Sequence, residues 1–319
     1  MAYGQSGHLA VSFQNSFGTS TTNSAHFIPI ISESLTEGIG QMVEKNMYGR
    51  LSEAPTHEGL HSIAGDIRTE AHPIGCGVLF KSALGRVTTT PQGAAFRHEF
   101  LPLTEDWDQF AAVPPTTIKV HRDVGSSFLY YDMLASALNL EMAHGQFFSA
   151  SINMVGGRFS QQAAALPAYP LGRLWSWDVT SASYDGAAVT DLRQLSLTFD
   201  NQLAAHHTLS SGKYPQRIKR SGAQTVGVEG TLLFQDQVLF NEFRNQTEKR
   251  LVLHFAGETV ATSYQNTLTI DIPRLRFSEF SPQLAGPGQL EVSFSAKGIF
   301  DPTSGYALRV TLTNTHPGY

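Results

Sequence analysis

Cysteine and charge are both scarce in this sequence. Cys76 is the single cysteine among 319 residues, which excludes an intramolecular disulfide and is typical of proteins assembled in a reducing compartment. Charged residues make up 15% of the chain, whereas roughly a quarter is usual in soluble domains. The formal net charge of -5 argues against a basic nucleic-acid-binding face. We therefore expect a protein without covalent links, much of whose surface is covered by neighbours.

Long apolar runs are absent as well. No stretch of the sequence approaches the roughly 18 residues that a membrane span needs. The first residues also lack the basic and apolar regions of a secretory signal. We expect synthesis in the cytoplasm and no membrane insertion.

The sequence also lacks the motifs that carry catalysis. There is no Gly-x-Ser-x-Gly elbow, His-Glu-x-x-His helix, Walker loop or paired-cysteine metal spacing. Three further groups could be imagined in catalysis or metal binding, but each has a simpler interpretation. We expect Cys76 to be a small buried residue, His206-His207 a surface histidine pair, and Glu105-Asp106-Trp107-Asp108 a solvated turn. We predict no catalytic residue, no metal site, no cofactor and no enzymatic activity.

What the sequence has in abundance is alternation of apolar and polar residues. It recurs at 138–142, 195–200 and 268–272. A period of two places one face of a strand on a core and the other toward water or a lumen. Helical periodicity is confined to two short segments, Pro73–Leu84 and Asp236–Asn245. The pattern predicts a mainly β protein with two short helices.

The same order of elements appears twice, which suggests an internal duplication. Each half has a strand, a long polar loop, a second strand, a helix and a meander that ends in a long alternating strand, Gln146–Val155 or Gln289–Lys297. Chance recurrence is the alternative, because alternating strands are common in any all-β protein. If the two halves are duplicates, the chain divides into an N-terminal arm (1–26), a first module (27–155), a linker rich in Gly, Ala and Pro (156–173) and a second module (174–319).

The two long loops carry opposite charge. The first, Thr36–His61, is net negative, and its counterpart, Asn201–Gln224, is net positive. Such loops suit head-to-tail contacts between stacked copies, and two ordinary solvated loops are the alternative. The candidate residues for contacts between subunits or rings are Glu37, Glu44, Arg50, Glu53, Glu58, Lys213, Arg217, Lys219 and Arg220.

Three stretches resemble the tail tube proteins, or major tail proteins, of bacteriophages with long non-contractile tails (siphoviruses). They are Ile30–Glu37, then Gly65-Asp66-Ile67 leading into a helix that ends at Leu84-Gly85, and Leu284–Gln289 followed by the alternating strand through Ala296. The resemblance covers most of the chain as a pattern of elements.

This resemblance implies a fold and a function. Family modules are β sandwiches or barrels with a flanking α-helix, and their sheets join neighbours into a ring-shaped β-barrel. Rings stack into the tube through which the genome is ejected. Because most members carry one module and form hexamers, two modules imply homotrimeric, pseudo-hexameric rings. The implied setting is the virion tail, assembled in the host cytoplasm. The implied partners are the tape-measure, tail terminator and tail-tip proteins, with non-specific passage of genomic DNA.

In such a ring the polar faces of the long alternating strands line the channel. A polar lumen without a basic stripe lets DNA slide, since neutralisation of phosphates by Lys and Arg dominates DNA affinity. A register error of one residue would exchange the two strand faces. The lumen candidates are Glu141, Ser149, Ser151, Asn153, Glu291, Ser293, Ser295 and Lys297, of which Lys297 fits only if it pairs with Glu291 of a neighbour.

A carbohydrate-binding β-sandwich module is the main alternative. Trp175 and Trp177 are two residues apart and could form the exposed aromatic pair that such a module needs. An enzyme on a β scaffold is a third possibility, but it would need a convergent polar pocket for which the sequence offers no set of residues.

Overall fold

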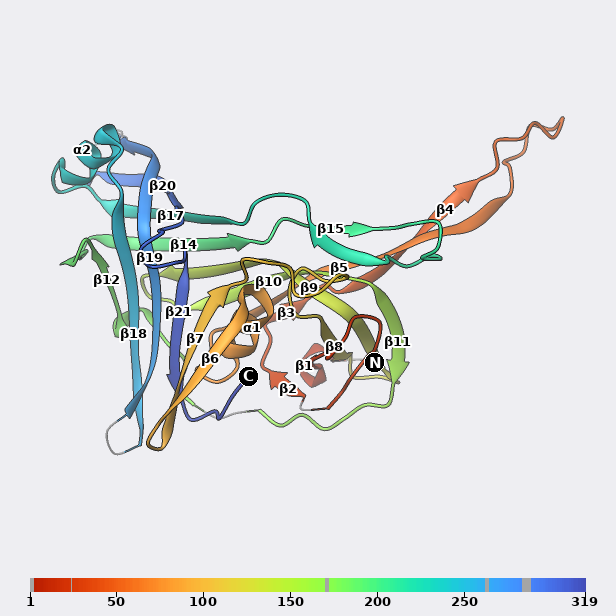
Figure 1. Cartoon of the computed structure of the whole chain (residues 1–319), viewed down its shortest axis with the longest axis horizontal. Coiled ribbons are helices and arrows are strands. Elements are labelled where there is room, and N and C mark those ends of the chain that lie inside the picture. The colour runs from red at the N-terminus through yellow and green to blue at the C-terminus, as the bar shows by residue number, and fades with distance from the viewer. Residues whose placement is uncertain (1–2, 24, 170–171, 262–263, 283–287) are drawn as a thin grey trace.

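The computed structural model describes residues 3–23, 25–169, 172–261, 264–282 and 288–319. The described chain is mainly β, as the sequence predicts, with 19 strands in one hydrogen-bonded network, a separate two-stranded sheet and two α-helices (Figure 1). Strand β9 (Ser127–Ala143) pairs at its start in one sheet and at its end in another. We call the sheet that contains the start of β9 sheet A and the sheet that contains its end sheet B.

Sheet A is antiparallel and has the order β2-β1-β8-β9-β11. Its strands other than β9 are β1 (His8–Phe13), β2 (His26–Ile28), β8 (Thr116–His121) and β11 (Arg158–Gln162). Strand β1 is buried on both faces, so the segment expected as an N-terminal arm contains an interior strand. Burial on both faces removes the alternation that would have revealed it in the sequence.

Sheet B extends through both halves of the chain in the order β4-β5-β10-β9-β14-β17-β20-β19, with β3 also beside β5. At β19 it continues to β18, β12 and β13 on one side and to β21, β7 and β6 on the other. The first-half strands are β3 (Ser32–Glu33), β4 (Thr36–Val43), β5 (Thr56–Glu70), β6 (Gly85–Gln92), β7 (Ala95–Pro102) and β10 (Ser149–Gly156). The second-half strands are β12 (Thr180–Tyr184), β13 (Ala187–Ala188), β14 (Leu192–Asp200), β17 (Thr225–Leu233), β18 (Lys249–Ala261), β19 (Tyr264–Pro282), β20 (Glu291–Gly298) and β21 (Arg309–Asn314).

The strand pairing of the first half recurs in the second. Strand β5 pairs with β10, β10 with β9, β9 with β8 and β11, and β8 with β1. In the same way β17 pairs with β20, β20 with β19, β19 with β18 and β21, and β18 with β12. Strands β9 and β19 each carry a bulge at the matching position, at Ser136 and Ser278. Among the described residues, only the first half adds a hairpin of this kind, β6–β7, which lies in the region expected as a meander after the first helix.

A helix follows the second long strand in each half, as predicted. Helix α1 (Cys76–Leu84) begins three residues after Pro73 and is almost entirely buried, whereas α2 (Val238–Asn245) has no buried residue. The Asp236 carboxylate lies at the start of α2 and accepts a hydrogen bond from the Val238 N–H at 2.9 Å. Two short 3-10 helices lie at Gly4–Ser6 and Trp177–Val179.

The two long loops are more ordered than the sequence suggests. Most of the segment 36–61 is a hairpin of β4 and β5 that projects from the body of the chain (Figure 1). Strands β15 (Leu203–His206) and β16 (Arg217–Arg220) form the separate sheet inside the second segment. The segment expected as a linker also contains strand β11, after which residues 163–169 have no regular structure.

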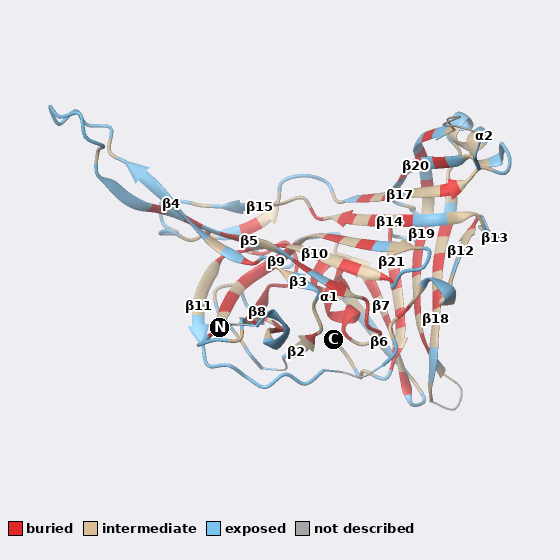
Figure 2. Cartoon of the chain, turned by 180° about the vertical axis from the view of Figure 1, so that it is seen from behind, coloured by how far each residue is buried: buried red, intermediate tan, exposed pale blue. Residues whose placement is uncertain are grey.

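The main core lies between the inner faces of the sheets and joins both halves (Figure 2). The rings of Phe148 from the first half and Phe255 from the second have centroids 4.6 Å apart. Trp175 is fully buried beside Phe255 and anchors the end of the connecting segment. The halves therefore share one hydrophobic core as well as one sheet.

Tyr319 ties the C-terminal segment to the start of α1. Its hydroxyl accepts a hydrogen bond from Asn314 Nδ2 and donates one to the Ile74 carbonyl, both at 2.7 Å. A Cβ at Gly77 would lie 2.2 Å from the Tyr319 ring, so only glycine leaves room for the ring there. Burial raises the pKa of the Tyr319 hydroxyl, which therefore stays protonated and able to donate.

We expect Tyr319→Phe to lower the free energy of unfolding by about 1–3 kcal/mol, because the partly buried Ile74 carbonyl loses its donor. Urea denaturation of the variant and of wild type measures this difference. Tyr3→Phe is the matched control, since the Tyr3 side chain is exposed. Equal effects of the two substitutions would contradict the role given to the Tyr319 hydroxyl.

Candidate functional site

One face of sheet B is polar across both halves of the chain. Residues on β10 and β20 alternate between buried apolar and exposed or half-buried polar side chains, as predicted. The eight polar residues singled out in the sequence all lie on the same face, four on β9 and β10 and four on β20; these are Glu141, Ser149, Ser151, Asn153, Glu291, Ser293, Ser295 and Lys297.

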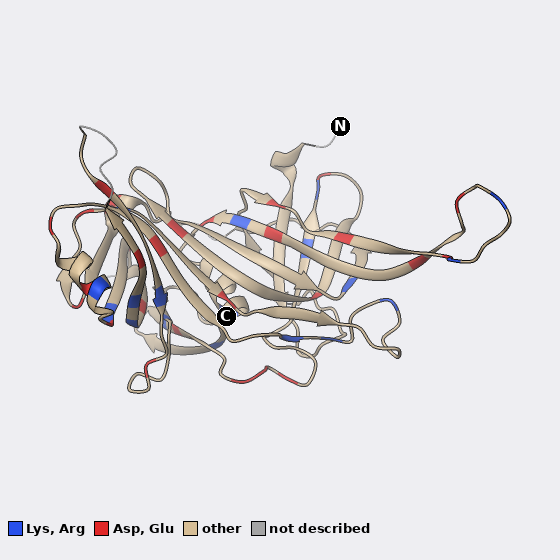
Figure 3. Ribbon diagram, turned by 90° about the horizontal axis from the view of Figure 1, so that it is seen from above, with Lys and Arg blue, Asp and Glu red and all other residues tan. Residues whose placement is uncertain are grey.

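Glutamate and serine alternate in a row that crosses seven strands of this face. In the register of the sheet the row reads Glu70, Ser149, Glu141, Ser196, Glu229, Ser295 and Glu279. Because neighbouring strands lie about 4.8 Å apart, successive carboxylates in the row are separated by about 10 Å. At that spacing, close to the screening length of physiological salt, the carboxylates repel one another only weakly. The register therefore spaces the carboxylates of the row evenly across the face. Figure 3 shows the acidic and basic residues along the ribbon.

Hydrogen bonds link polar side chains across four strands of the same face. Asn153 Nδ2 donates to Asp66 Oδ1 at 2.7 Å, and Asn139 Nδ2 donates to Asn153 Oδ1 at 3.0 Å. The Thr198 hydroxyl donates to Asn139 Oδ1 at 2.9 Å and so carries the chain of bonds from β9 to β14. The polar face therefore contributes to the junction between the two halves.

The basic side chains on this face are fewer than the acidic ones. Arg68 forms an ion pair with Glu141 at 3.2 Å. Lys297 lies opposite Arg276 on β19 and Gly227 on β17, while Glu291 approaches Arg193 of its own chain at 3.9 Å. Lys297 and Arg276 are thus neighbours, with Arg276 also 3.7 Å from Glu248, and Arg68 lies apart from them, so the basic groups described on this face form no continuous stripe.

The β4–β5 hairpin extends beyond the body of the chain and is exposed along most of its length (Figure 2). Several of its exposed residues are apolar. Single exposed apolar residues are ordinary, but several of them on one projecting element favour an interaction surface. The exposed apolar residues of the hairpin are Ile39, Met42, Val43, Met47, Leu51 and Leu60.

A histidine joins the base of this hairpin to the second long segment. His61 is buried between Glu37 and Glu58, with its ring nitrogens 2.8 and 2.6 Å from the two carboxylates. The Tyr214 hydroxyl also reaches Glu37, and Lys213 pairs with Glu58. The hydrogen bond to Glu37 is the main reason that the pKa of His61 is raised.

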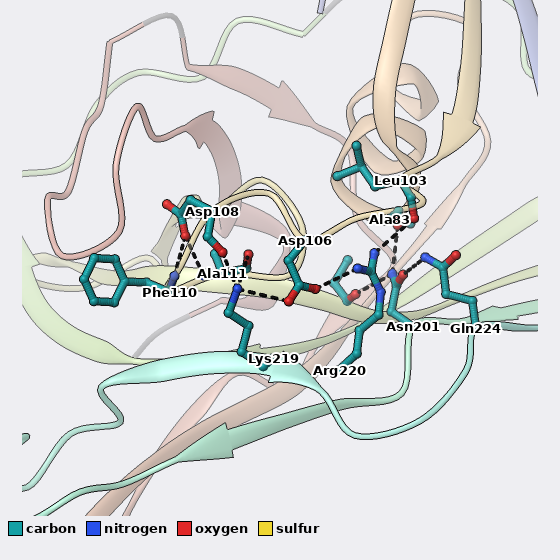
Figure 4. A network of polar contacts seen from close by, with 11 residues as sticks. Ala83, Leu103, Asp106, Asp108, Phe110, Ala111, Asn201, Lys219, Arg220 and Gln224 are labelled. Carbon is teal, nitrogen blue, oxygen red and sulfur yellow. Dashed lines mark hydrogen bonds and ion pairs between the residues drawn. The ribbon is translucent and has the colours of Figure 1, made fainter.

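The second segment is fastened to the first half by Lys219 and Arg220 (Figure 4). Their cationic groups lie 3.1 and 2.8 Å from the two oxygens of Asp106, and Arg220 also donates to the Leu103 carbonyl. Asp108 accepts hydrogen bonds from the backbone of Phe110 and Ala111 and so shapes the same turn. The acidic cluster is therefore a structural turn, as the sequence analysis predicts.

Most of the charged loop residues already have partners within the chain. Glu37, Glu58 and Lys213 meet at the base of the hairpin, Glu44 pairs with His57, and Lys219 and Arg220 bind Asp106. In the described parts of the chain Arg50, Glu53 and Arg217 form no ion pair, and Arg50 packs over the Tyr48 ring. Sequence analysis found the opposite charge of the loops, but it did not show that the two loops lie side by side.

Groups suited to metal binding or nucleophilic catalysis are not found among the described residues. The described residues hold no group of three or more His, Cys, Asp or Glu side chains arranged for a metal ion. Burial raises the pKa of the Cys76 thiol, so it is unsuited to act as a nucleophile. Among the described residues, no helix is long and apolar enough to cross a membrane.

The two tryptophans do not form a flat aromatic platform. Trp175 is fully buried in the core, whereas Trp177 is 45% exposed and lies beside the ring of His144. A glycan-binding surface would need both rings on one exposed face. Trp175 and Trp177 therefore do not form the exposed aromatic pair that favoured a carbohydrate-binding module.

A mainly β chain with an unbroken polar sheet face, a projecting apolar hairpin and two similarly paired halves is typical of structural proteins that assemble with copies of themselves. The family model described as "Phage tail tube protein" matches residues 4–298. The chain belongs to the phage tail tube protein family and has a structural role in the virion tail. No curated protein matches the sequence. Of the stretches that resemble the family, residues 284–287 lie outside the described residues.

We expect the His61 contacts to stabilise the fold most at low pH. Because the pKa of folded His61 is raised above its ordinary value of 6.5, protonation favours the folded state. The stabilisation is complete below pH 6.5 and is lost as the pH rises through the higher folded pKa. The free energy of unfolding of wild type should therefore exceed that of His61→Gln mainly at acidic pH.

Urea denaturation of both proteins across neutral pH measures this difference. His206→Gln, at an exposed histidine of the second segment, serves as the control. If the difference in free energy of unfolding between wild type and His61→Gln does not change with pH, the proposed role of His61 protonation is wrong.

Proposed function

We propose that this chain self-assembles into homotrimeric rings that stack into the phage tail tube, the conduit for genome ejection. Its two halves, at residues 27–155 and 174–319, act as two copies of one tail tube module. The recurring strand pairing and the matching serine bulges support this division. Three copies then supply six modules, so the ring has pseudo-sixfold symmetry.

The pairing of β14 with β9 is the observation that carries the proposal. Seven residues of β14, Gln194–Asp200, pair antiparallel with Ala137–Ala143 of β9. This junction shows that the sheet of one half can extend directly into the sheet of the next. An open sheet exposes unpaired edges, and closure of sheet B into a ring removes them.

The polar face of sheet B lines the channel of the proposed tube. Its alternating glutamates and serines, from Glu70 to Glu279, give a hydrated and negatively charged wall. DNA binds mainly through phosphate contacts with Lys and Arg. A wall whose few basic groups are scattered among carboxylates therefore lets genomic DNA pass without retaining it.

The β4–β5 hairpin makes contacts between copies. Its exposed apolar residues need a cover, and the unpaired charges of Arg50, Glu53 and Arg217 lie on the same hairpin or on the β15–β16 segment beside it. We assign this hairpin to contacts between stacked rings. The tape-measure protein fills the channel before ejection, and tail terminator and tail-tip proteins bind the two ends of the tube, which is assembled in the host cytoplasm.

Negative-stain electron microscopy of the purified chain over a range of protein and salt concentrations tests the proposal. We expect rings or hollow tubes whose end views have threefold or pseudo-sixfold symmetry. Particles that stay monomeric at every concentration, also after addition of tail-tip protein as initiator, would overturn it.

The channel assignment predicts which cysteines are shielded in tubes. A maleimide on a polyethylene glycol chain too wide for the channel should react with Ser293→Cys in monomers but not in tubes, because Ser293 lies on the polar face. Ser20→Cys is the control, since Ser20 is exposed on the segment that lies along sheet A. A small maleimide should label both. Equal labelling of the two variants by the large reagent in tubes would show that this face is not the channel wall.

A further inference from the structure

The pairing of β14 with β9, which joins the two halves of the chain, can be compared with the strand edges that are left unpaired. Strand β14 lies between β17 and β9, so both of its edges are paired. Its counterpart in the first half is β3–β4, which lies beside β5. Within the described residues no strand pairs with the other edge of β3–β4. The counterpart of β9 is β19, and beyond Leu275 its described residues pair on one edge alone, with β20.

The register of the sheet fixes which residues correspond. Met154 lies opposite Ala135 of β9 and Gly65 of β5, and Ala296 lies opposite Phe277 of β19 and Val228 of β17. Counting from these positions past the serine bulges, Ala137–Leu140 correspond to Glu279–Pro282. Counting along the other strand, Leu197–Asp200 correspond to Leu35–Gly38, because Leu197 lies opposite Val228 and Thr36 lies opposite Ala64.

We propose that the open edge of β19 at Glu279–Pro282 binds the β3–β4 segment Leu35–Gly38 of a second copy of this chain, antiparallel and in the register of the internal junction. This proposal rests on the proposed function and specifies the contact through which it would occur. Leu197 pairs with Leu140 and Asp200 with Ala137 inside the chain. Between chains, Leu35 then lies opposite Pro282, Thr36 opposite Ser281, Glu37 opposite Phe280 and Gly38 opposite Glu279.

The backbone groups at this edge fit the proposed register. At the internal junction the Asn201 N–H donates to the Ser136 carbonyl and the His144 N–H to the Arg193 carbonyl, so alternate odd-numbered residues of β14 face β9. The corresponding residue Leu35 would face Pro282, which has no N–H to offer. The Leu35 carbonyl already accepts hydrogen bonds from Arg122 at 2.7 Å and Tyr130 at 3.0 Å, and the Leu35 N–H already donates to Glu33 Oε2 at 3.0 Å. Leu35 therefore needs no backbone partner from Pro282, and the backbone bonds of this register would form between Glu37 and Phe280.

The side chains also fit. Thr198 lies opposite Asn139 at the internal junction and donates a hydrogen bond to it. The corresponding pair between chains is Thr36 and Ser281, two exposed hydroxyl side chains that can form the same kind of bond. Phe280 and Leu138 are both buried and both point to the apolar face. Opposite Phe280, Glu37 takes the place that Phe199 has at the internal junction, and its carboxylate is already held by His61 and Tyr214.

Disulfide trapping tests the register directly. Thr36 and Ser281 would form a non-hydrogen-bonded antiparallel pair, whose Cα atoms lie about 4.5 Å apart, within the range that a disulfide spans. The double variant Thr36→Cys/Ser281→Cys should therefore form disulfides between chains when tubes are mildly oxidised. The native Cys76 is buried and does not compete. On a non-reducing gel the products should end at a closed trimer.

Thr36→Cys/Glu279→Cys is the matched control, because it keeps one cysteine and moves the other two residues along the same exposed face. We expect it to cross-link several-fold less. If Thr36→Cys/Ser281→Cys does not assemble, Gly38→Cys/Glu279→Cys tests the same register, since these residues would also lie opposite each other.

The outcomes separate this proposal from the proposed function. Tubes in which the control cross-links as well as the in-register pair, or in which the link forms within a single chain, would overturn the edge and register assigned here and leave the tail tube role standing. Wild-type protein that forms neither rings nor tubes, also after addition of tail-tip protein, would overturn both.

Discussion

The antiparallel pairing of β9 with β14 is the interaction on which the rest of the structure depends. It carries sheet B from one half of the chain into the other and aligns their polar faces in one register. The shared core follows from it, because Phe148 and Phe255 can meet only when the two inner faces are continuous. The Thr198–Asn139–Asn153 hydrogen bonds and the row of glutamates and serines follow from the same register.

Sequence reasoning was most successful where one strand face is buried and the other is exposed. The period of two along Gln146–Val155 and Gln289–Lys297 fixed which residues share a face, and the structure confirms that the eight polar candidates lie together. Both helices were found at nearly their true positions, because each combines helical periodicity with a start signal, Pro73 in one and Asp236 in the other. That this face lines a channel stays a prediction until tubes are tested.

Elements without a one-sided pattern escaped sequence reasoning. Strand β1 is buried on both faces, and β4 is exposed on nearly all its residues, so neither alternates. The partners of the loop charges could not be read from the sequence, because Lys213 and Glu58 are brought together only by the fold. Likewise Trp175 and Trp177 look alike in sequence, and only packing against Phe255 separates the buried ring from the exposed one.

The covalent connection between the halves has a kinetic consequence for ring formation. Where two modules share one chain, every second contact between neighbouring modules of the proposed ring forms during folding. Its effective concentration does not depend on how much protein the cell holds. Only the contacts at the open edge of β19 then require collisions between molecules. Ring closure would depend on a lower power of protein concentration than it would for separate single modules, so rings could appear earlier as the protein accumulates.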